Sequence, residues 1–258
     1  SSAPARGVAY VGVFGSSNFA TTFSVSFVYH TDSVDGFVAA VASHEVGHNL
    51  GLSHDGTLKA DGSKDAEYYS GHGTGAASWS PIMGSGSGQI IQWSRGEYFR
   101  ANNPQDDLAI ITTVLSRRAD DHADNSVTPT PLLANGPAVQ HRGVITSAAD
   151  QDWFSFQTAG AISLAITPHT APFTLNRSAL DVRAELYSAS GTLLATSDPA
   201  DSSSATFDLS PGPGTFYLRV VGASIGTPQA DPPSGYANYA SIGDFTITGR
   251  VTPCATAA

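Results

Sequence analysis

The segment that decides the fold of the first half of this chain reads HEVGHNLGLSHD, from His44 to Asp55. In a helix, residues four apart lie about 6 Å apart along the axis with side chains on the same face. His44 and His48 can therefore offer one ring nitrogen each to the same Zn²⁺ ion. Glu45 points about 100° away from His44, where it is better placed to orient a water molecule than to bind the ion.

A third ligand cannot come from the same helix, because a residue six positions beyond His48 would lie too far along the axis. Gly51 supplies the positive φ that a sharp turn needs, and the turn brings His54 back to the ion. Three neutral imidazoles leave one position of Zn²⁺ open for water, as in catalytic zinc sites. The pattern predicts a zinc-dependent metalloendopeptidase, in which a zinc-bound water attacks the peptide bond and Glu45 is the general base.

Two alternatives use the same residue types. An amphipathic helix can carry two satisfied core histidines and a glutamate, and a structural metal site can carry the same three residues. Neither alternative explains Gly51 and His54, so we favour the catalytic zinc site.

The segment resembles the metzincin zinc endopeptidases, and Asp55 directly after the third histidine makes it most similar to the reprolysin (adamalysin) branch. The methionine turn of that family is matched by SPIMG at residues 80–84, which contains the only methionine of the chain. The resemblance implies that Met83 forms an apolar floor under the three imidazoles. It also implies that Gly51 and Asp55 support the turn around the site.

The resemblance extends upstream, to GVAYVGV at residues 7–13. In the family this edge strand pairs with an extended substrate, which implies substrate contacts at Ala9, Tyr10 and Val11. An ordinary edge or core strand fits these residues equally well. Only 43 residues precede His44, fewer than in the N-terminal half of metzincin catalytic domains. The resemblance therefore implies that a missing N-terminal part of the catalytic domain is a partner of this chain.

The composition excludes some classes of function. The 258 residues contain 12 Lys and Arg against 22 Asp and Glu, a net charge of −10, which excludes a basic nucleic-acid-binding surface. No run approaches the 18 or so apolar residues that a membrane span needs. A single cysteine, Cys254, allows no disulfide within the chain. Few lysines among many Ser, Thr, Gly and Ala residues are typical of a secreted, extracellular bacterial protein.

The chain divides near a polar, proline-containing stretch, which predicts a linker over residues 120–137. Residues 1–119 are predicted to be α+β, with strands near 8–13 and 23–29, a helix from about Asp32 to Gly51, a loop over 57–95 and a last helix over 105–115. Apolar residues alternate with polar ones in five later stretches, which are 153–157, 162–166, 182–186, 216–221 and 245–248. Residues 138–258 are therefore predicted to form an all-β antiparallel sandwich of the jelly-roll type.

The second half resembles the bacterial pre-peptidase C-terminal domain. The resemblance rests on ADQDWFSF at 149–156, LYSASGTLLA at 186–195 and GTFYLRV at 214–220. Such domains accompany secreted peptidases, and some relatives bind collagen or Ca²⁺. Asp150 and Asp152 could be Ca²⁺ ligands, although acidic residues before a strand also serve as turn formers.

The sequence therefore predicts the C-terminal part of a metzincin-like zinc protease domain, followed by a β-sandwich, with protein or peptide substrates. The alternative is a catalytically inactive, zinc-containing fragment whose sandwich binds a matrix or surface.

Overall fold

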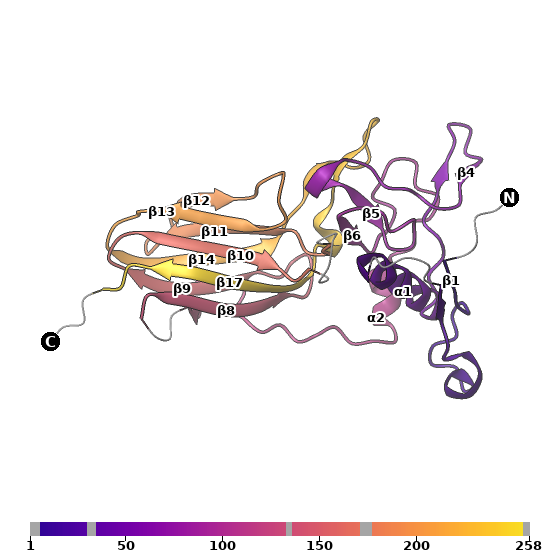
Figure 1. Cartoon of the computed structure of the whole chain (residues 1–258), viewed down its shortest axis with the longest axis horizontal. Helices are drawn as coiled ribbons and strands as arrows, with labels where there is room; N and C mark the ends of the chain where they lie inside the picture. The colour runs from indigo at the N-terminus through magenta and orange to yellow at the C-terminus, as the bar shows by residue number, and fades with distance from the viewer. Residues whose placement is uncertain (1–5, 30–34, 133–135, 171–176, 255–258) are drawn as a thin grey trace. The chain divides into compact units, whose positions relative to one another are not determined.

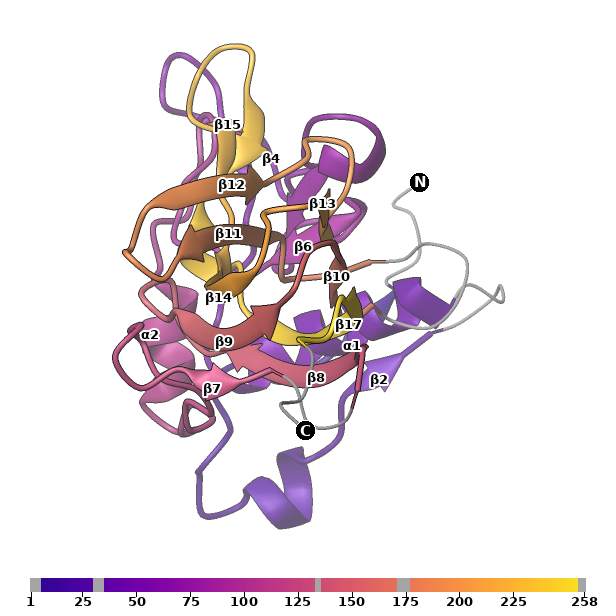
Figure 2. The same ribbon diagram turned by 90° about the vertical axis from the view of Figure 1, so that its left-hand side faces the viewer.

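The computed structural model describes residues 6–29, 35–132, 136–170 and 177–254. The chain forms two compact units, whose elements are drawn in Figures 1 and 2. Unit 1 consists of Ser1–Arg117, Thr170–Ser178 and Ile225–Ala240, and unit 2 of Arg118–His169, Ala179–Ser224 and Ser241–Ala258. In the described part of the chain, no helix combines the length and hydropathy needed to cross a bilayer.

The boundary between the units differs from the predicted linker over residues 120–137. β7 (Thr130–Pro131) pairs in parallel with β9 (Asp152–Thr158), and Leu132 is buried in the core of unit 2. Asp121 accepts a hydrogen bond from a strand amide of the same unit. The polar composition that predicted a solvated linker therefore supplies hydrogen-bond acceptors at the edge of the sandwich instead.

Two segments of the predicted sandwich domain fold with unit 1 instead. These are Thr170–Ser178 and Ile225–Ala240. The carbonyl of Ser178 accepts from the amide of Ile91 in β6 (Ile90–Gln92) at 3.0 Å, and its amide donates to the carbonyl of Gln89, just before that strand, at 3.1 Å. Tyr236 is buried in a cluster with residues of the first half. These contacts join residues far apart in sequence, so local periodicity does not reveal them.

Unit 2 is a sandwich of a four-stranded sheet, in the order β13-β10-β17-β8, and a five-stranded sheet, in the order β12-β11-β14-β9-β7. Every pairing is antiparallel except β7 with β9. The β-sandwich predicted for the second half is therefore confirmed. The other strands are β8 (Ala138–Ile145), β10 (Ile162–Pro168), β11 (Val182–Ser188), β12 (Leu193–Ser197), β13 (Ala205–Leu209), β14 (Gly214–Gly222) and β17 (Gly243–Val251).

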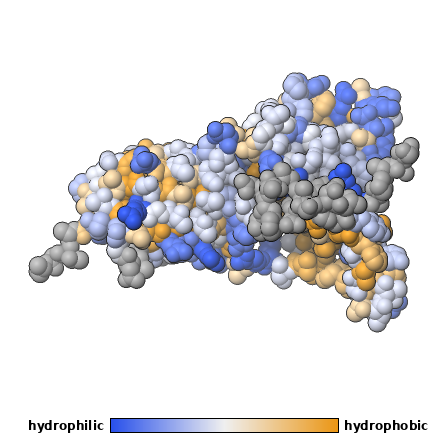
Figure 3. Space-filling model, viewed as in Figure 1, coloured by the Kyte–Doolittle hydropathy of each residue, from blue (hydrophilic) through white to orange (hydrophobic). Residues whose placement is uncertain are grey.

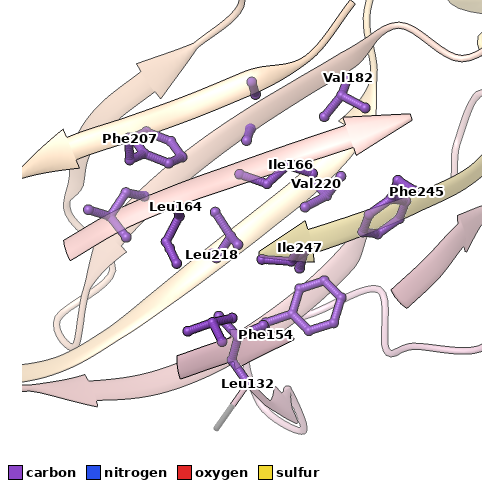
Figure 4. Packing of buried hydrophobic residues seen from close by; sticks show 14 of the residues in the cluster. Leu132, Phe154, Leu164, Ile166, Val182, Phe207, Leu218, Val220, Phe245 and Ile247 are labelled. Carbon is purple, nitrogen blue, oxygen red and sulfur yellow. The ribbon is translucent and has the colours of Figure 1, made fainter. Parts of the chain in front are cut away.

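Alternation along the strands sends one set of side chains between the two sheets. In β14, Phe216, Leu218 and Val220 are buried, whereas Tyr217 and Arg219 are only partly buried on the other face. Each fully buried side chain of this size stabilises the fold by about 1.5–3 kcal/mol. Figure 4 shows the packing, which also includes Leu132, Phe154, Leu164, Ile166, Val182, Phe207, Phe245 and Ile247.

Unit 1 has little regular structure. Its helices are α1 (Asp35–Asn49) and α2 (Asp107–Thr112), with a π-helical turn at Phe19–Phe23 and 3₁₀ turns at Gly75–Ala77 and Asn238–Ala240. Its strands form four two-stranded pairs. They are β1 (Gly7–Val8) with β2 (Phe27–Val28), β3 (Thr57–Leu58) with β4 (Lys64–Ala66), β5 (Trp79–Pro81) with β6, and β15 (Ile225–Thr227) with β16 (Ser234–Tyr236).

Several boundaries in unit 1 differ from the predicted ones. The strands expected near 8–13 and 23–29 shrink to two residues each, and the stretch 57–95, predicted to be a loop, contains β3 to β6. The helix expected over 105–115 is only six residues long. Asp32, where the first helix was expected to begin, lies outside the described residues. The helix that carries His44, Glu45 and His48 is confirmed as α1 over its described length.

Helix α1 packs against the side chain of Met83 at Gly47. Met83 is fully buried in a cluster that includes Leu52 and Ile82. A Cβ atom at Gly47 would lie 2.5 Å from the sulfur of Met83 and 3.2 Å from the ring of Trp93. The close approach of helix and methionine therefore requires that position 47 carries no side chain.

This packing predicts whether a substitution at Gly47 stabilises or destabilises the protein. In an ordinary helix interior, Gly→Ala stabilises by roughly 1 kcal/mol. Gly47→Ala should instead lower the free energy of unfolding by about 1–3 kcal/mol, because the methyl group overpacks the contact with Met83. Chemical denaturation followed by circular dichroism measures the change. In a Met83→Ala background the same substitution should be neutral or stabilising, and equal effects in both backgrounds would contradict the packing argument.

Candidate metal centre

A glycine turn carries the chain from α1 back toward the same helix. α1 ends at Asn49, and Gly51 follows with φ +103°. The amide of Leu52 donates to the carbonyl of Gly47 at 3.0 Å, which closes the helix end. A Cβ at Gly51 would meet nothing closer than 3.9 Å, so glycine is needed here for its backbone conformation and not for space. The turn directs His54 back to the helix.

The structure brings the three predicted ligands together. The ring centroids of His44, His48 and His54 lie 4.7 to 5.3 Å apart. One ligand atom of each residue lies within 4.8 Å of the other two, and the Nε2 atoms of His48 and His54 are 2.9 Å apart. Glu45 is not part of this group of ligand atoms.

The outer nitrogen of each ring faces an acceptor. Nδ1 of His44 donates to the carbonyl of Ile82 at 2.8 Å, and Nδ1 of His48 donates to a carbonyl of the glycine turn at 2.9 Å. Nδ1 of His54 lies 2.5 Å from a carboxylate oxygen of Glu67. These acceptors assign the hydrogen to Nδ1 in each ring, which leaves a lone pair on each Nε2.

Two facing lone pairs at 2.9 Å repel each other unless a cation lies beside them. Imidazole nitrogens are preferred ligands of Zn²⁺, and an outer hydrogen bond on Nδ1 is the usual way in which proteins orient such ligands. The donor set of this site therefore fits a zinc ion.

The electrostatics keep the three rings neutral at pH 7. Burial lowers the pKa of His44 from 6.5 to about 4. Burial also lowers the pKa values of His48 and His54, and the charge of Lys64 acts on His54 in the same direction. Neutral imidazole is the form that binds metal, so no proton has to leave these rings at neutral pH.

Glu45 lies on the same helix, under β1. Its residue is only 5% exposed, and burial raises the pKa of its carboxyl group. A Cβ at Gly7 would come within 2.2 Å of Oε1 of Glu45, so β1 crosses close to the carboxylate and a side chain at position 7 would displace it. The carboxylate is thereby confined on one side by backbone.

Asp55 is tied to the methionine turn by its backbone. Its amide donates to the carbonyl of Met83 at 2.9 Å, so the residue after the third histidine is joined to the chain beneath the site. Its side chain is almost fully buried, and burial raises the pKa of the carboxyl group to about 7. Asn103 opposes that shift through a hydrogen bond.

The three predicted substrate-binding residues, Ala9, Tyr10 and Val11, do not lie in a strand. The carbonyl of Tyr10 accepts a hydrogen bond from the side chain of Asn49, and the amide of Gly12 donates to the carbonyl of His48. This stretch therefore uses backbone groups to hold the end of α1, which competes with pairing to an extended peptide.

Sequence reasoning missed two neighbours of His54. Glu67 accepts its Nδ1 hydrogen, and the ring of Tyr68 lies 4.4 Å from its ring, centroid to centroid. The charge of Glu45 also helps to raise the pKa of Tyr68, after burial. A charged residue and a tyrosine in a polar loop carry no local signal, so only the fold identifies them.

Two further groups of candidate metal ligands lie in the described part of unit 2. Carboxylate oxygens of Asp120, Asp124 and Asp150 lie within 4.8 Å of one another, and Asp152 belongs to a neighbouring group with Asp121 and His122. Asp152 is fully buried, and neither of its oxygens has a hydrogen-bond partner among the described residues. Burial, followed by the charges of Asp150 and Asp121, raises the pKa of Asp152 to about 8.

The sequence of unit 1 is similar to that of known metallopeptidases. Residues 1–99 match the reprolysin model described as Metallo-peptidase family M12. The snake venom metalloproteinase fibrolase of Macrovipera lebetinus is 34% identical over 86 residues, which cover 32% of this chain and 38% of that protein. The matched part thus spans well under half of the relative's length.

Two solved structures were found with low overall agreement. The pre-peptidase C-terminal domain of a Bacillus anthracis collagenase covers 53% of this chain and 100% of its own, with 16% identity and a TM-score of 0.31. A periplasmic lysozyme inhibitor of Aeromonas hydrophila covers 47% and 96%, with 8% identity and a TM-score of 0.29. On the family match and the metalloproteinase similarity, residues 1–99 of this chain resemble the reprolysin metallopeptidases of family M12.

Proposed function

We propose that this protein is a secreted zinc metalloendopeptidase. The observation that carries the proposal is the convergence of His44, His48 and His54, whose ligand atoms lie within 4.8 Å of one another, beside the buried Glu45 of α1. The similarity of residues 1–99 to family M12 supports the same class of enzyme. Secretion rests on the low lysine content and the small polar residues of the sequence.

In the proposed site, His44, His48 and His54 would hold Zn²⁺ through Nε2, and the bound ion would supply Lewis acidity toward a water molecule and a peptide carbonyl. The carboxylate of Glu45 would accept a proton from the attacking water and return it to the leaving amine. Burial moves the pKa of Glu45 toward neutral pH, and a general base works best when its pKa lies near the pH of the reaction. Met83 supports the helix from below.

A further part of the catalytic domain is the proposed partner of unit 1. Hydrophobic residues gather near the N-terminal segment in Figure 3. Burying such side chains against protein is favourable by about 25 cal/mol per Å², so this surface suits a covering element. The side chains, each between 47% and 60% exposed, are Val8, Tyr10, Val11, Val25, Phe27 and Tyr29.

Replacement of the proposed base separates metal binding from catalysis. Glu45→Gln keeps the shape of the side chain under β1 but cannot accept a proton. It should retain one equivalent of zinc and lower kcat on casein or an unstructured peptide by about 10²–10⁴-fold. A zinc chelator should abolish hydrolysis by the unsubstituted protein. Asp61→Asn, at an exposed carboxylate, is the matched control, and hydrolysis that survives both chelation and Glu45→Gln would refute the proposal.

We also propose that unit 2 binds Ca²⁺ at the group of Asp120, Asp124 and Asp150, with Asp152 of the neighbouring group beside it. A buried carboxylate without a hydrogen-bond partner is costly, and Asp152 places two such oxygens beside other acids. Oxygen ligands are what Ca²⁺ prefers, and its charge would compensate the mutual repulsion. Asp150 and Asp152 are the two ligands that the sequence suggested, while the others come from the stretch before β7.

The calcium proposal predicts a pH dependence. Without calcium, Asp152 has a pKa of about 8 when folded, against 3.8 ordinarily, so the folded state binds more protons than the unfolded state between these values. The contribution of Asp152 to stability therefore falls as pH rises through this window. At pH 8, Ca²⁺ should raise the melting temperature in scanning calorimetry, more than at pH 5.

Substitutions make this test specific to the site. Asp152→Asn should raise the calcium-free melting temperature at pH 8 and reduce the response to Ca²⁺, whereas Asp201→Asn, at an exposed acid, should change neither. A melting temperature that is the same with and without Ca²⁺ at pH 8 would exclude the site.

A matrix- or surface-binding role for unit 2, with an inactive zinc fragment, is the second candidate. Its support is an aromatic group on the outer face of the five-stranded sheet. Tyr187 lies opposite Tyr217 across β11 and β14, and the rings of Trp153 and Tyr187 are 5.2 Å apart. Partly exposed tyrosine and tryptophan are the residues most often found in binding interfaces.

This second role is tested by co-sedimentation with insoluble collagen. Trp153→Ala with Tyr217→Ala should reduce the bound fraction at least tenfold, because the aromatic contact area is lost, whereas Thr206→Ala on the other sheet should not. Binding by the unsubstituted protein, together with one equivalent of zinc and no hydrolysis of any peptide, would favour this role over the peptidase. Unchanged binding by the double variant would exclude this face.

A further inference from the structure

We propose that Glu67 is a positioning residue for the third zinc ligand. The proposal rests on the proposed function, because it assigns Glu67 a role toward the zinc ion through His54. Glu67 itself lies outside the group of ligand atoms and acts only through the Nδ1 hydrogen of His54.

The third histidine needs an orienting partner more than the other two do. His44 and His48 lie on α1, and their Nδ1 atoms donate to backbone carbonyls held by the methionine turn and the glycine turn. His54 lies beyond the helix, and its side chain is 25% exposed. Its Nδ1 has a side-chain acceptor, Oε1 of Glu67, at 2.5 Å. Glu67 therefore replaces the backbone carbonyl that orients the other rings.

The backbone around Glu67 is fixed relative to His54. The amide of Tyr69 donates to the carbonyl of Asp55 at 2.6 Å, and the amide of Ser85 donates to the carbonyl of Tyr69 at 3.0 Å. A Cβ at Gly56 would lie 2.2 Å from the carbonyl oxygen of the residue before Glu67. The segment is thus held between the residues after His54 and the methionine turn.

The charge of Glu67 distinguishes it from the carbonyl acceptors. A carboxylate partner makes an imidazole more basic and a stronger metal ligand than a neutral acceptor does. Lys64 pairs with the second oxygen of Glu67, which leaves Oε1 to face His54. The ring of Tyr68 packs against His54 at 4.4 Å between centroids. Together these contacts hold the ring in one orientation.

The same geometry predicts that the role of Glu67 is separable from folding. Its side chain is 44% exposed and that of Lys64 is 58% exposed, and exposed ion pairs contribute little to stability. Loss of Glu67 should therefore weaken zinc binding while the melting temperature of the zinc-free protein stays almost unchanged.

Zinc affinity, measured by competition with a chromophoric chelator, tests the proposal on the full chain. Glu67→Gln keeps a neutral acceptor and should weaken zinc binding roughly 10-fold, whereas Glu67→Ala removes the acceptor and should weaken it up to about 100-fold. The visible spectrum of the Co²⁺-substituted protein should change in both variants. Asp65→Asn is the matched control. Asp65 is a nearby exposed acid that accepts a hydrogen bond from Thr57 and lies outside the group of the three histidines.

Two results would overturn the proposal, and they are distinguishable. If the unsubstituted protein binds one zinc and Glu67→Ala binds it within twofold of the same affinity, the role of Glu67 is refuted while the peptidase proposal stands. If the unsubstituted protein binds no zinc, the proposed function fails, and the role of Glu67 fails with it.

Discussion

The convergence of the His44, His48 and His54 rings is the constraint on which unit 1 depends. The outer nitrogen of each ring faces an acceptor, and the inner Nε2 atoms of His48 and His54 lie 2.9 Å apart. Backbone carbonyls hold two of the rings, and the carboxylate of Glu67 holds the third. α1 supplies two of the rings, and the turn at Gly51 returns the third.

The other contacts in this part of unit 1 hold the residues around the three histidines in place. Met83 lies against Gly47 on the lower side of α1, and the amide of Asp55 is bonded to the carbonyl of Met83. The residue after the third ligand and the floor of the site are thus parts of one hydrogen-bonded unit. Glu45 is confined by the backbone at Gly7. Few of these contacts belong to regular secondary structure, so a unit with short strands can still define a site.

Burial shifts the pKa values of ionisable groups in opposite directions in the two units. In unit 1 the histidines are neutral because burial lowers their pKa values, so a metal meets ligands that are already deprotonated. In unit 2, burial raises the pKa of Asp152 to about 8, so this carboxyl group keeps its proton at pH 7. Both cases follow from the same desolvation, which always disfavours the ionised form.

The sequence by itself determined the spacing of His44, Glu45 and His48, because helical geometry converts a separation of four residues into one shared face. It also determined the period-two strands of unit 2, since alternation is a property of each strand alone. The linker and the strand over 7–13 were misplaced for a related reason. Local composition does not show which backbone groups a segment bonds, such as Asn49 with the carbonyl of Tyr10.

Only the tertiary structure decided what surrounds these residues. The partnership of Glu67 with His54, the contact of Gly47 with Met83 and the return of Ile225–Ala240 to unit 1 join residues from different elements, and no periodicity encodes them. The types and spacing of nearby residues predict which side chains can bind a metal. The orientation of each of these side chains depends on hydrogen-bond acceptors that folding brings from elsewhere in the chain.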